Sequence, residues 1–85
     1  MEVFSVYDSK AEAYLQPFFA QTRGVAIRQF EAAANSVEHN FYRFGADFTL
    51  FHIGQWDEHD GTLVMFEVKD SLGTALQFQR HEETE

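Results

Sequence analysis

The stretch Thr22–Val37, TRGVAIRQFEAAANSV, has the clearest helical spacing of apolar residues in the chain. Its apolar side chains recur with a period of about 3.6 residues and fall on one stripe, which comprises Ala26, Ile27, Phe30, Ala33, Ala34 and Val37. Thr22 can cap the start, because its hydroxyl can accept a backbone N–H that the first turn leaves unpaired. The pattern predicts an amphipathic helix that exits near Asn35-Ser36.

Two extended segments precede this helix. Residues 1–7 alternate in the two-residue period of a strand and are rich in β-branched and aromatic side chains. After a polar turn at residues 8–12, residues 13–21 alternate again, with Tyr14 and Phe18 on the same side. Pro17 cannot donate to a ladder, so this segment should form an edge strand or break there. A β-hairpin is the simplest interpretation, and a short helical turn at residues 11–15 is the alternative.

A second pair of strands is expected after the helix. Residues 38–47 have no clean period and are interpreted as a loop. Strands are predicted over residues 48–54 and 62–68, joined by a turn at Asp60-Gly61. Ser71 can cap a closing helix over residues 72–80, and a short acidic tail follows from about residue 81.

These elements define a single α+β domain over residues 1–85, with two antiparallel β-hairpins and two helices in the order β-β-α-β-β-α. The second pair of strands is apolar on both faces, so each face needs a covering layer. Helices can supply one layer and a second copy of the sheet the other, which predicts a homodimer. The 10 Phe, 3 Tyr and 1 Trp can lie in the core or at such an interface, and both alternatives stay open.

Composition and charge narrow the function classes. The chain has no cysteine, which excludes disulfides and thiolate metal sites. No apolar run approaches the roughly 20 residues that span a bilayer, and the start lacks a basic segment followed by an apolar one. We expect a soluble, untargeted protein. The net charge of −8 disfavours simple adhesion to phosphates, although the acidity is concentrated after residue 54, which leaves room for a basic face on the first half.

The polar residues do not form a recognisable catalytic or metal site. The histidines at 39, 52, 59 and 81 lack the close pairing typical of metal ligands. The carboxylates of residues 57–60 lie in a loop too polar to raise their pKa values by desolvation, and no nucleophile is nearby. We therefore expect no enzyme activity, no metal and no cofactor.

A mixture of aromatic and basic residues remains as the candidate binding site. Rings can stack on the bases of single-stranded nucleic acid while basic groups follow the phosphates. The candidate DNA-binding residues are Lys10, Tyr14, Arg23, Arg28, Tyr42 and Arg43. At these positions the aromatic residues can also be core residues, and the basic ones can be solvated surface charges.

Three blocks of the chain resemble a known family. They are Val6-Tyr7-Asp8 with Lys10-Ala11, Tyr14, Pro17-Phe18, Gly24, Ala26, Arg28 and Phe30; then Leu50-Phe51, Ile53-Gly54, Asp57 and Gly61; then Ser71-Leu72-Gly73, Ala75 and Phe78. In this order they are similar to the small nonstructural proteins of gokushovirus-type microviruses, which are single-stranded DNA bacteriophages. The resemblance covers most of the chain, except residues 35–46 and those after residue 80.

The resemblance implies a phage protein that acts in the host bacterial cytoplasm. It further implies binding of single-stranded DNA at the switch from duplex replication to single-stranded genome synthesis. The alternative is an acidic adaptor that docks on the phage replication-initiation protein, a procapsid component or a host replication factor without contacting DNA. DNA binding should weaken steeply with salt, whereas an aromatic protein contact should not.

Overall fold

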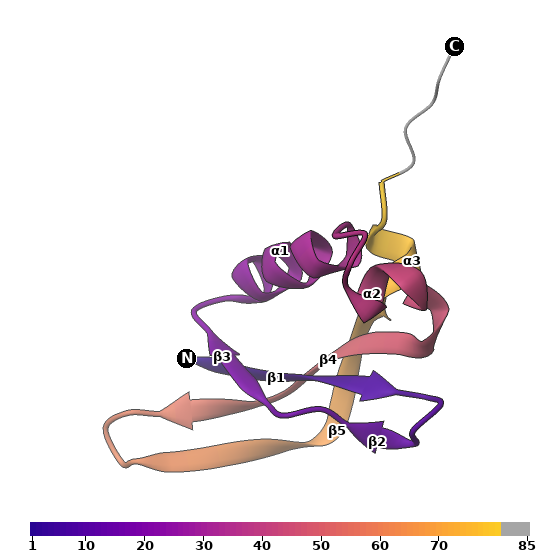
Figure 1. Cartoon of the computed structure of the whole chain (residues 1–85). Coiled ribbons are helices and arrows are strands. Elements are labelled where there is room, and N and C mark those ends of the chain that lie inside the picture. Colours follow the sequence, from indigo (N-terminus) through magenta and orange to yellow (C-terminus); the bar gives the residue numbers. More distant parts are fainter. Residues whose placement is uncertain (81–85) are drawn as a thin grey trace.

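The computed structural model describes residues 1–80, which form an antiparallel sheet with the helices on one side (Figure 1). The elements along the chain are β1 (Glu2–Asp8), β2 (Ala13–Tyr14), β3 (Phe18–Ala20), α1 (Arg23–Ala34), α2 (Asn40–Arg43), the 3₁₀ turn η1 (Gly45–Asp47), β4 (Phe48–Asp57), β5 (Thr62–Thr74) and α3 (Ala75–Phe78). The α+β class is as predicted, but the order differs from β-β-α-β-β-α by a split strand and an additional short helix. The acidic tail predicted from about residue 81 lies outside the described residues.

The strand order is β2-β1-β4-β5, and β3 pairs with the same edge of β1 as β2 does. Strands β2 and β3 are thus two halves of one edge strand, interrupted by residues 15–17. Pro17 lies in the interruption, so the predicted edge position and break are both confirmed. The predicted strands before and after the helix are present, and β4 and β5 are longer than expected.

The interruption changes which side chains share a face. Tyr14 pairs with Tyr7, and Phe19 pairs with Val3. Directly paired residues point to the same face of a sheet, and so do residues two apart in a strand. Tyr14 therefore lies on one face with Phe19, while Phe18 points to the other. The expectation that Tyr14 and Phe18 share a side is wrong, because it assumed an unbroken alternation through Pro17.

Helix α1 begins as predicted. The Thr22 hydroxyl accepts the Val25 N–H at 3.2 Å, and the backbone of Thr22 is extended, as an N-cap requires. The helix ends at Ala34 with Asn35 as its C-cap, so Val37 falls outside the helix and is 66% exposed. The buried part of the predicted stripe is Ala26, Phe30 and Ala34.

The core lies between the sheet and the helices. Alternate residues of β1 and β4 face α1, and the buried cluster comprises Phe4, Val6, Ala20, Ala26, Phe30, Ala34, Phe48, Leu50 and Ala75. Aromatic packing extends the cluster, since the Phe41 ring lies 5.3 Å from that of Phe30 and 4.7 Å from that of Phe48. Part of the aromatic content is therefore core.

Residues 38–47 are not the loop that their irregular pattern suggested. His39 caps α2 by accepting the Phe41 N–H at its Nδ1 atom at 3.0 Å, and η1 follows directly. Both pieces are short, and Phe41 packs between α1 and β4. Tertiary contacts, rather than a helical repeat, hold this segment: the Phe41 ring packs on its neighbours, and the Gln79 amide donates to the carbonyl oxygens of Phe41 and Tyr42.

The predicted closing helix over residues 72–80 is wrong in its start, its cap and its end, because α3 spans only Ala75–Phe78. Ser71, Gly73 and Thr74 are paired with β4 as part of β5, and Gly73 has a φ of 133°, which an L side chain rarely adopts. The helix begins only at Ala75. Thr74 and Gln77 form a capping box, which supplies the N-terminal signal that Ser71 was expected to give.

Candidate functional site

The sheet has two unlike faces. Its helix face carries the core, whereas among residues 1–80 no helix covers the opposite face (Figure 1). We call this second surface the open face, and its accessible side chains come from Tyr7, Tyr14, Phe19, Phe51, Trp56, Leu63 and Met65. Val3 and Ser5 of β1 point to the same side and are buried. Tyr14, Phe19, Leu63 and Met65 are each more than 40% exposed. Single exposed apolar residues are ordinary on a surface, but a contiguous group indicates a contact site.

An aromatic cluster forms one end of the open face. The Tyr14 ring lies 4.8 Å from that of Tyr7 and 5.7 Å from that of Phe51, in tilted and edge-on arrangements. The Lys69 ammonium lies 5.6 Å from the centre of the Tyr14 ring, within cation–π range. The cluster therefore combines an exposed ring, two supporting rings and a positive charge.

A second apolar group lies at the other end of the open face. The Phe19 and Trp56 rings meet edge-on at 6.4 Å, and these residues line a shallow, open depression together with Met1. Met65 lies beside Gly54, where a Cβ would come within 2.6 Å of the Val64 carbonyl oxygen. Gly54 thus allows β5 to approach β4 closely under this part of the face.

Arg23, a predicted DNA-binding residue, is held in a polar network that joins four elements. Its Nε donates to Nδ1 of His52 at 2.9 Å, and its guanidinium is ion-paired with Asp70. His52 is buried, and its Nε2 lies 2.8 Å from the Glu2 carboxylate. Since a guanidinium can only donate, Nδ1 of His52 accepts, and a neutral His52 carries its proton on Nε2, from which it donates a hydrogen bond to a Glu2 carboxylate oxygen. The network connects the start of α1 to β1, β4 and β5.

The other predicted site residues are distributed over different parts of the fold. Tyr14 lies on the open face, Lys10 lies in the turn between β1 and β2, and Arg28 is exposed on α1. Tyr42 and Arg43 belong to α2, where the Arg43 guanidinium lies 5.6 Å from the Phe44 ring centre. Within residues 1–80, Arg28 makes no ion pair. The structure therefore separates Tyr14 from the basic residues of α1 and α2.

The sequence analysis did not select the residues that surround Tyr14 as site residues. The two-residue alternation already placed Tyr7 opposite the core residues Phe4 and Val6, so Tyr7 could have been found from the pattern. Phe51 and Lys69 could not, because their places next to Tyr14 depend on strand order and on the bend of β5.

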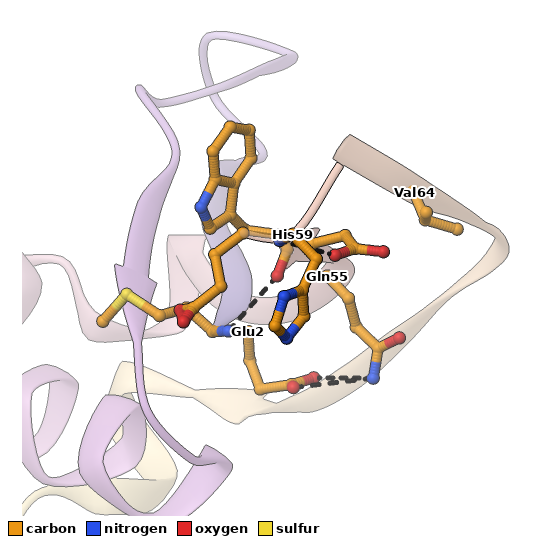
Figure 2. Close-up of a pocket in the computed structure, with 8 residues that line it drawn as sticks. Glu2, Gln55, His59 and Val64 are labelled. Carbon is orange, nitrogen blue, oxygen red and sulfur yellow. Dashed lines mark hydrogen bonds between the residues drawn. The ribbon is translucent and has the colours of Figure 1, made fainter. Parts of the chain in front are cut away.

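A shallow pocket between β1 and the β4–β5 hairpin is acidic and polar. Figure 2 shows the Gln55 side chain turned toward that of Glu2, with Val64 on the neighbouring arm of the hairpin. The Gln55 amide lies 3.4 and 3.5 Å from the two Glu2 carboxylate oxygens. No group of three or more His, Asp or Glu side chains within residues 1–80 is arranged to hold a metal ion.

The described residues thus form a small two-layer α+β protein with a helix-covered face and an open aromatic face. The model of the family described as Phage ORF5 protein matches residues 1–78, and the chain belongs to that family. It is therefore a phage protein. Neither the curated proteins nor the solved structures contain a match. None of the helices in residues 1–80 has the length and apolar character needed to cross a membrane.

Proposed function

We propose that this phage protein binds single-stranded DNA through the open face, at the switch from duplex replication to single-stranded genome synthesis in the host bacterial cytoplasm. The observation that carries the proposal is the exposed Tyr14 ring, supported by Tyr7 and Phe51 and flanked by Lys69. Sheet-borne aromatic rings bind unpaired bases by stacking, and nearby cations contact the phosphates. The membership of a phage family is consistent with a role in the phage replication cycle.

Part of the negative charge lies away from the proposed site, although Asp8 and Glu12 are next to Tyr14 at the β1–β2 turn. Glu58 and Asp60 are exposed at the tip of the β4–β5 hairpin, whereas Tyr14 and Lys69 lie at the other end of the sheet. Because the Debye length is about 10 Å at 0.1 M salt, charges at the tip are largely screened from a ligand on Tyr14. A strand held by stacking also needs fewer phosphate contacts than one held by charge alone.

The test is fluorescence anisotropy of labelled single- and double-stranded oligonucleotides at two salt concentrations. We expect a preference for the single strand, with affinity falling as salt rises. The Tyr14→Ala variant should lose about 1 to 3 kcal/mol of binding free energy, the typical contribution of one stacked base. Tyr42→Ala is the matched control, because Tyr42 is as exposed as Tyr14 but lies on α2.

Equal losses in the two variants would contradict the assignment of DNA to the open face. Retained affinity in Tyr14→Ala together with a loss in Arg28→Glu would instead locate the DNA on α1, where the sequence placed part of the site. An absence of binding to either oligonucleotide at low salt would overturn the DNA-binding proposal as a whole.

The second candidate is an acidic adaptor that docks on a phage or host replication or assembly protein, such as the phage replication-initiation protein. The net charge of −8 favours it, and two of the six basic residues are already paired, Arg23 with Asp70 and Arg80 with Glu31. The open face is then a protein interface. A contact of this kind should depend only weakly on salt, unlike DNA binding.

A further inference from the structure

The outer edge of β5 offers unpaired backbone groups. β5 is the last strand in the sheet order, so residues 62–65 have no strand on their outer side among the described residues. The opposite edge of the sheet differs, because it is made of two short strands separated at Pro17. Proteins commonly block a free edge with charge, proline or a bulge, since such an edge can pair with another chain.

The hydrogen bonds of β4 show which groups of β5 point outward. Both backbone groups of Trp56 bond to Met1, with distances of 2.8 Å from the Trp56 N–H and 3.3 Å to the Trp56 carbonyl oxygen. Backbone groups of successive strand residues point to alternate sides, so Gln55 faces β5 and its partner Val64 faces β4. The N–H and C=O groups of Leu63 and Met65 therefore point to the free edge.

Residues 62–65 lack the features that block an edge. None of them is charged or proline, and Leu63, Val64 and Met65 are 51–54% exposed. The blocking features come only afterwards, in residues 66–69, which bulge between the Met65–Gly54 and Asp70–His52 pairs and contain Glu67 and Lys69. The unblocked edge on the hairpin arm is thus short.

We propose that the occupant of this edge is a second copy of the chain, paired antiparallel through β5 with Val64 on the twofold axis. In this register Leu63 of each copy pairs with Met65 of the other, and all four outward-facing groups of each edge are used. Axes at Leu63 or Met65 would pair one of these residues with Gly61 or Glu67 instead. The edge is therefore complementary to itself in one register.

Charge and side-chain direction favour this arrangement over stacking of two open faces. Each copy carries a net charge of −8, so association is least opposed where charged residues are absent, as in residues 62–66. Leu63 and Met65 point to the open face, while Val64 points to the other face with Gln55. Edge pairing contacts side chains on both faces and satisfies the backbone, whereas face stacking reaches only one face.

Such a dimer has one continuous sheet with both open faces on the same side, because the twofold axis is perpendicular to the sheet. The inference does not rest on DNA binding, and light scattering tests it independently of anisotropy. If both proposals hold, one DNA strand can cross two aromatic clusters.

Light scattering of the full chain over a range of concentrations is the first test. We expect twice the mass of one chain, and a monomer at every concentration would overturn the proposal. In Val64→Lys, two like charges would meet at the axis and should weaken association at least about tenfold. Val37→Lys is the control, because this exposed valine lies after α1 and should leave the dimer unchanged.

Cross-linking tests the register without disturbing the fold. The chain contains no cysteine, so a single introduced thiol reports on one position. In the proposed register, residue 64 of one copy lies opposite residue 64 of the other. The two form a narrow, non-hydrogen-bonded pair with Cα atoms about 4.5 Å apart, which suits a disulfide. Val64→Cys should cross-link under mild oxidation much faster than Val68→Cys, although Val68 is 77% exposed. Equal cross-linking rates for the two cysteine variants, or a dimer that persists in a well-folded Val64→Lys variant, would overturn the proposed β5-edge dimer.

Discussion

The two faces of the sheet carry similar apolar residues but differ in how deeply these residues are buried. On the helix face, Phe4 and Leu50 are fully buried under α1 and its neighbours. On the open face, Tyr14 of β2 and Phe19 of β3, which both pair with β1, are 46% and 44% exposed. Composition does not separate the two groups, since both are mainly aromatic and aliphatic.

The side of the sheet, rather than the residue type, determines how exposed these aromatic residues are. Rings on the helix face contribute to stability, because their burial removes apolar area from water. Rings on the open face contribute less to stability and remain available for a ligand. Substitutions on the two faces should therefore separate stability from binding.

The largest effect should come from the helix face. Leu50→Ala removes a fully buried side chain, and the resulting cavity should lower the free energy of unfolding by about 2 to 5 kcal/mol. Urea denaturation followed by circular dichroism measures the change. A loss below about 1 kcal/mol, which is typical of surface sites, would mean that the helix face is not the stabilising one.

The next effect should come from the network at the start of α1. Arg23→Ala removes the donor to Nδ1 of the buried His52 and should destabilise the protein by about 1 to 3 kcal/mol. The Arg23–Asp70 ion pair adds little, because both side chains are about half exposed. Affinity of the folded variant for single-stranded DNA should be unchanged. A large loss of affinity without destabilisation would restore Arg23 as a DNA contact.

A smaller loss of stability is expected at the cap of the helix that covers the core. Thr22→Ala removes the acceptor for the Val25 N–H and should cost about 0.5 to 2 kcal/mol of unfolding free energy. Thermal unfolding measures it, with Thr22→Ser as the control that keeps the hydroxyl. Equal melting temperatures for the alanine variant and the wild type would show that the cap contributes nothing.

The smallest effect on stability should come from the charge on the open face. Lys69→Gln removes the ammonium near Tyr14, a contact worth about 0.5 to 1 kcal/mol at an exposed site. If Lys69 contacts a phosphate, the slope of log affinity against log salt should fall by about 0.7 for a single strand. Anisotropy titrations at several salt concentrations measure that slope. An unchanged slope would show that Lys69 does not contact a phosphate of the DNA.

Local signals were enough to predict several parts of the fold. Thr22 capped α1 as expected, and the apolar stripe correctly identified Ala26, Phe30 and Ala34 as buried. Gly61 adopts a φ of 67° in the turn predicted from Asp60-Gly61, and the edge strand breaks at Pro17. Each of these outcomes depends on bonding or backbone freedom within a few residues, so the sequence contains the necessary information.

The candidate site was predicted only in part. Tyr14 was selected from the sequence, but its neighbours Phe51 and Lys69 come from strands that are distant along the chain. Arg23 was selected as a free cation, and the fold instead pairs it with His52 and Asp70. Composition and spacing cannot show such contacts, because they arise from strand order.

The start of α1, the break in the edge strand and the hairpin turn follow from local sequence, because caps, prolines and glycines act on their own neighbours. Three other features arise only when the chain is folded: β5 continues through Gly73, Phe41 packs in the segment predicted to be a loop, and Tyr14 and Phe19 share the open face. These features depend on pairing and packing between distant segments, which become favourable only when the sheet is assembled.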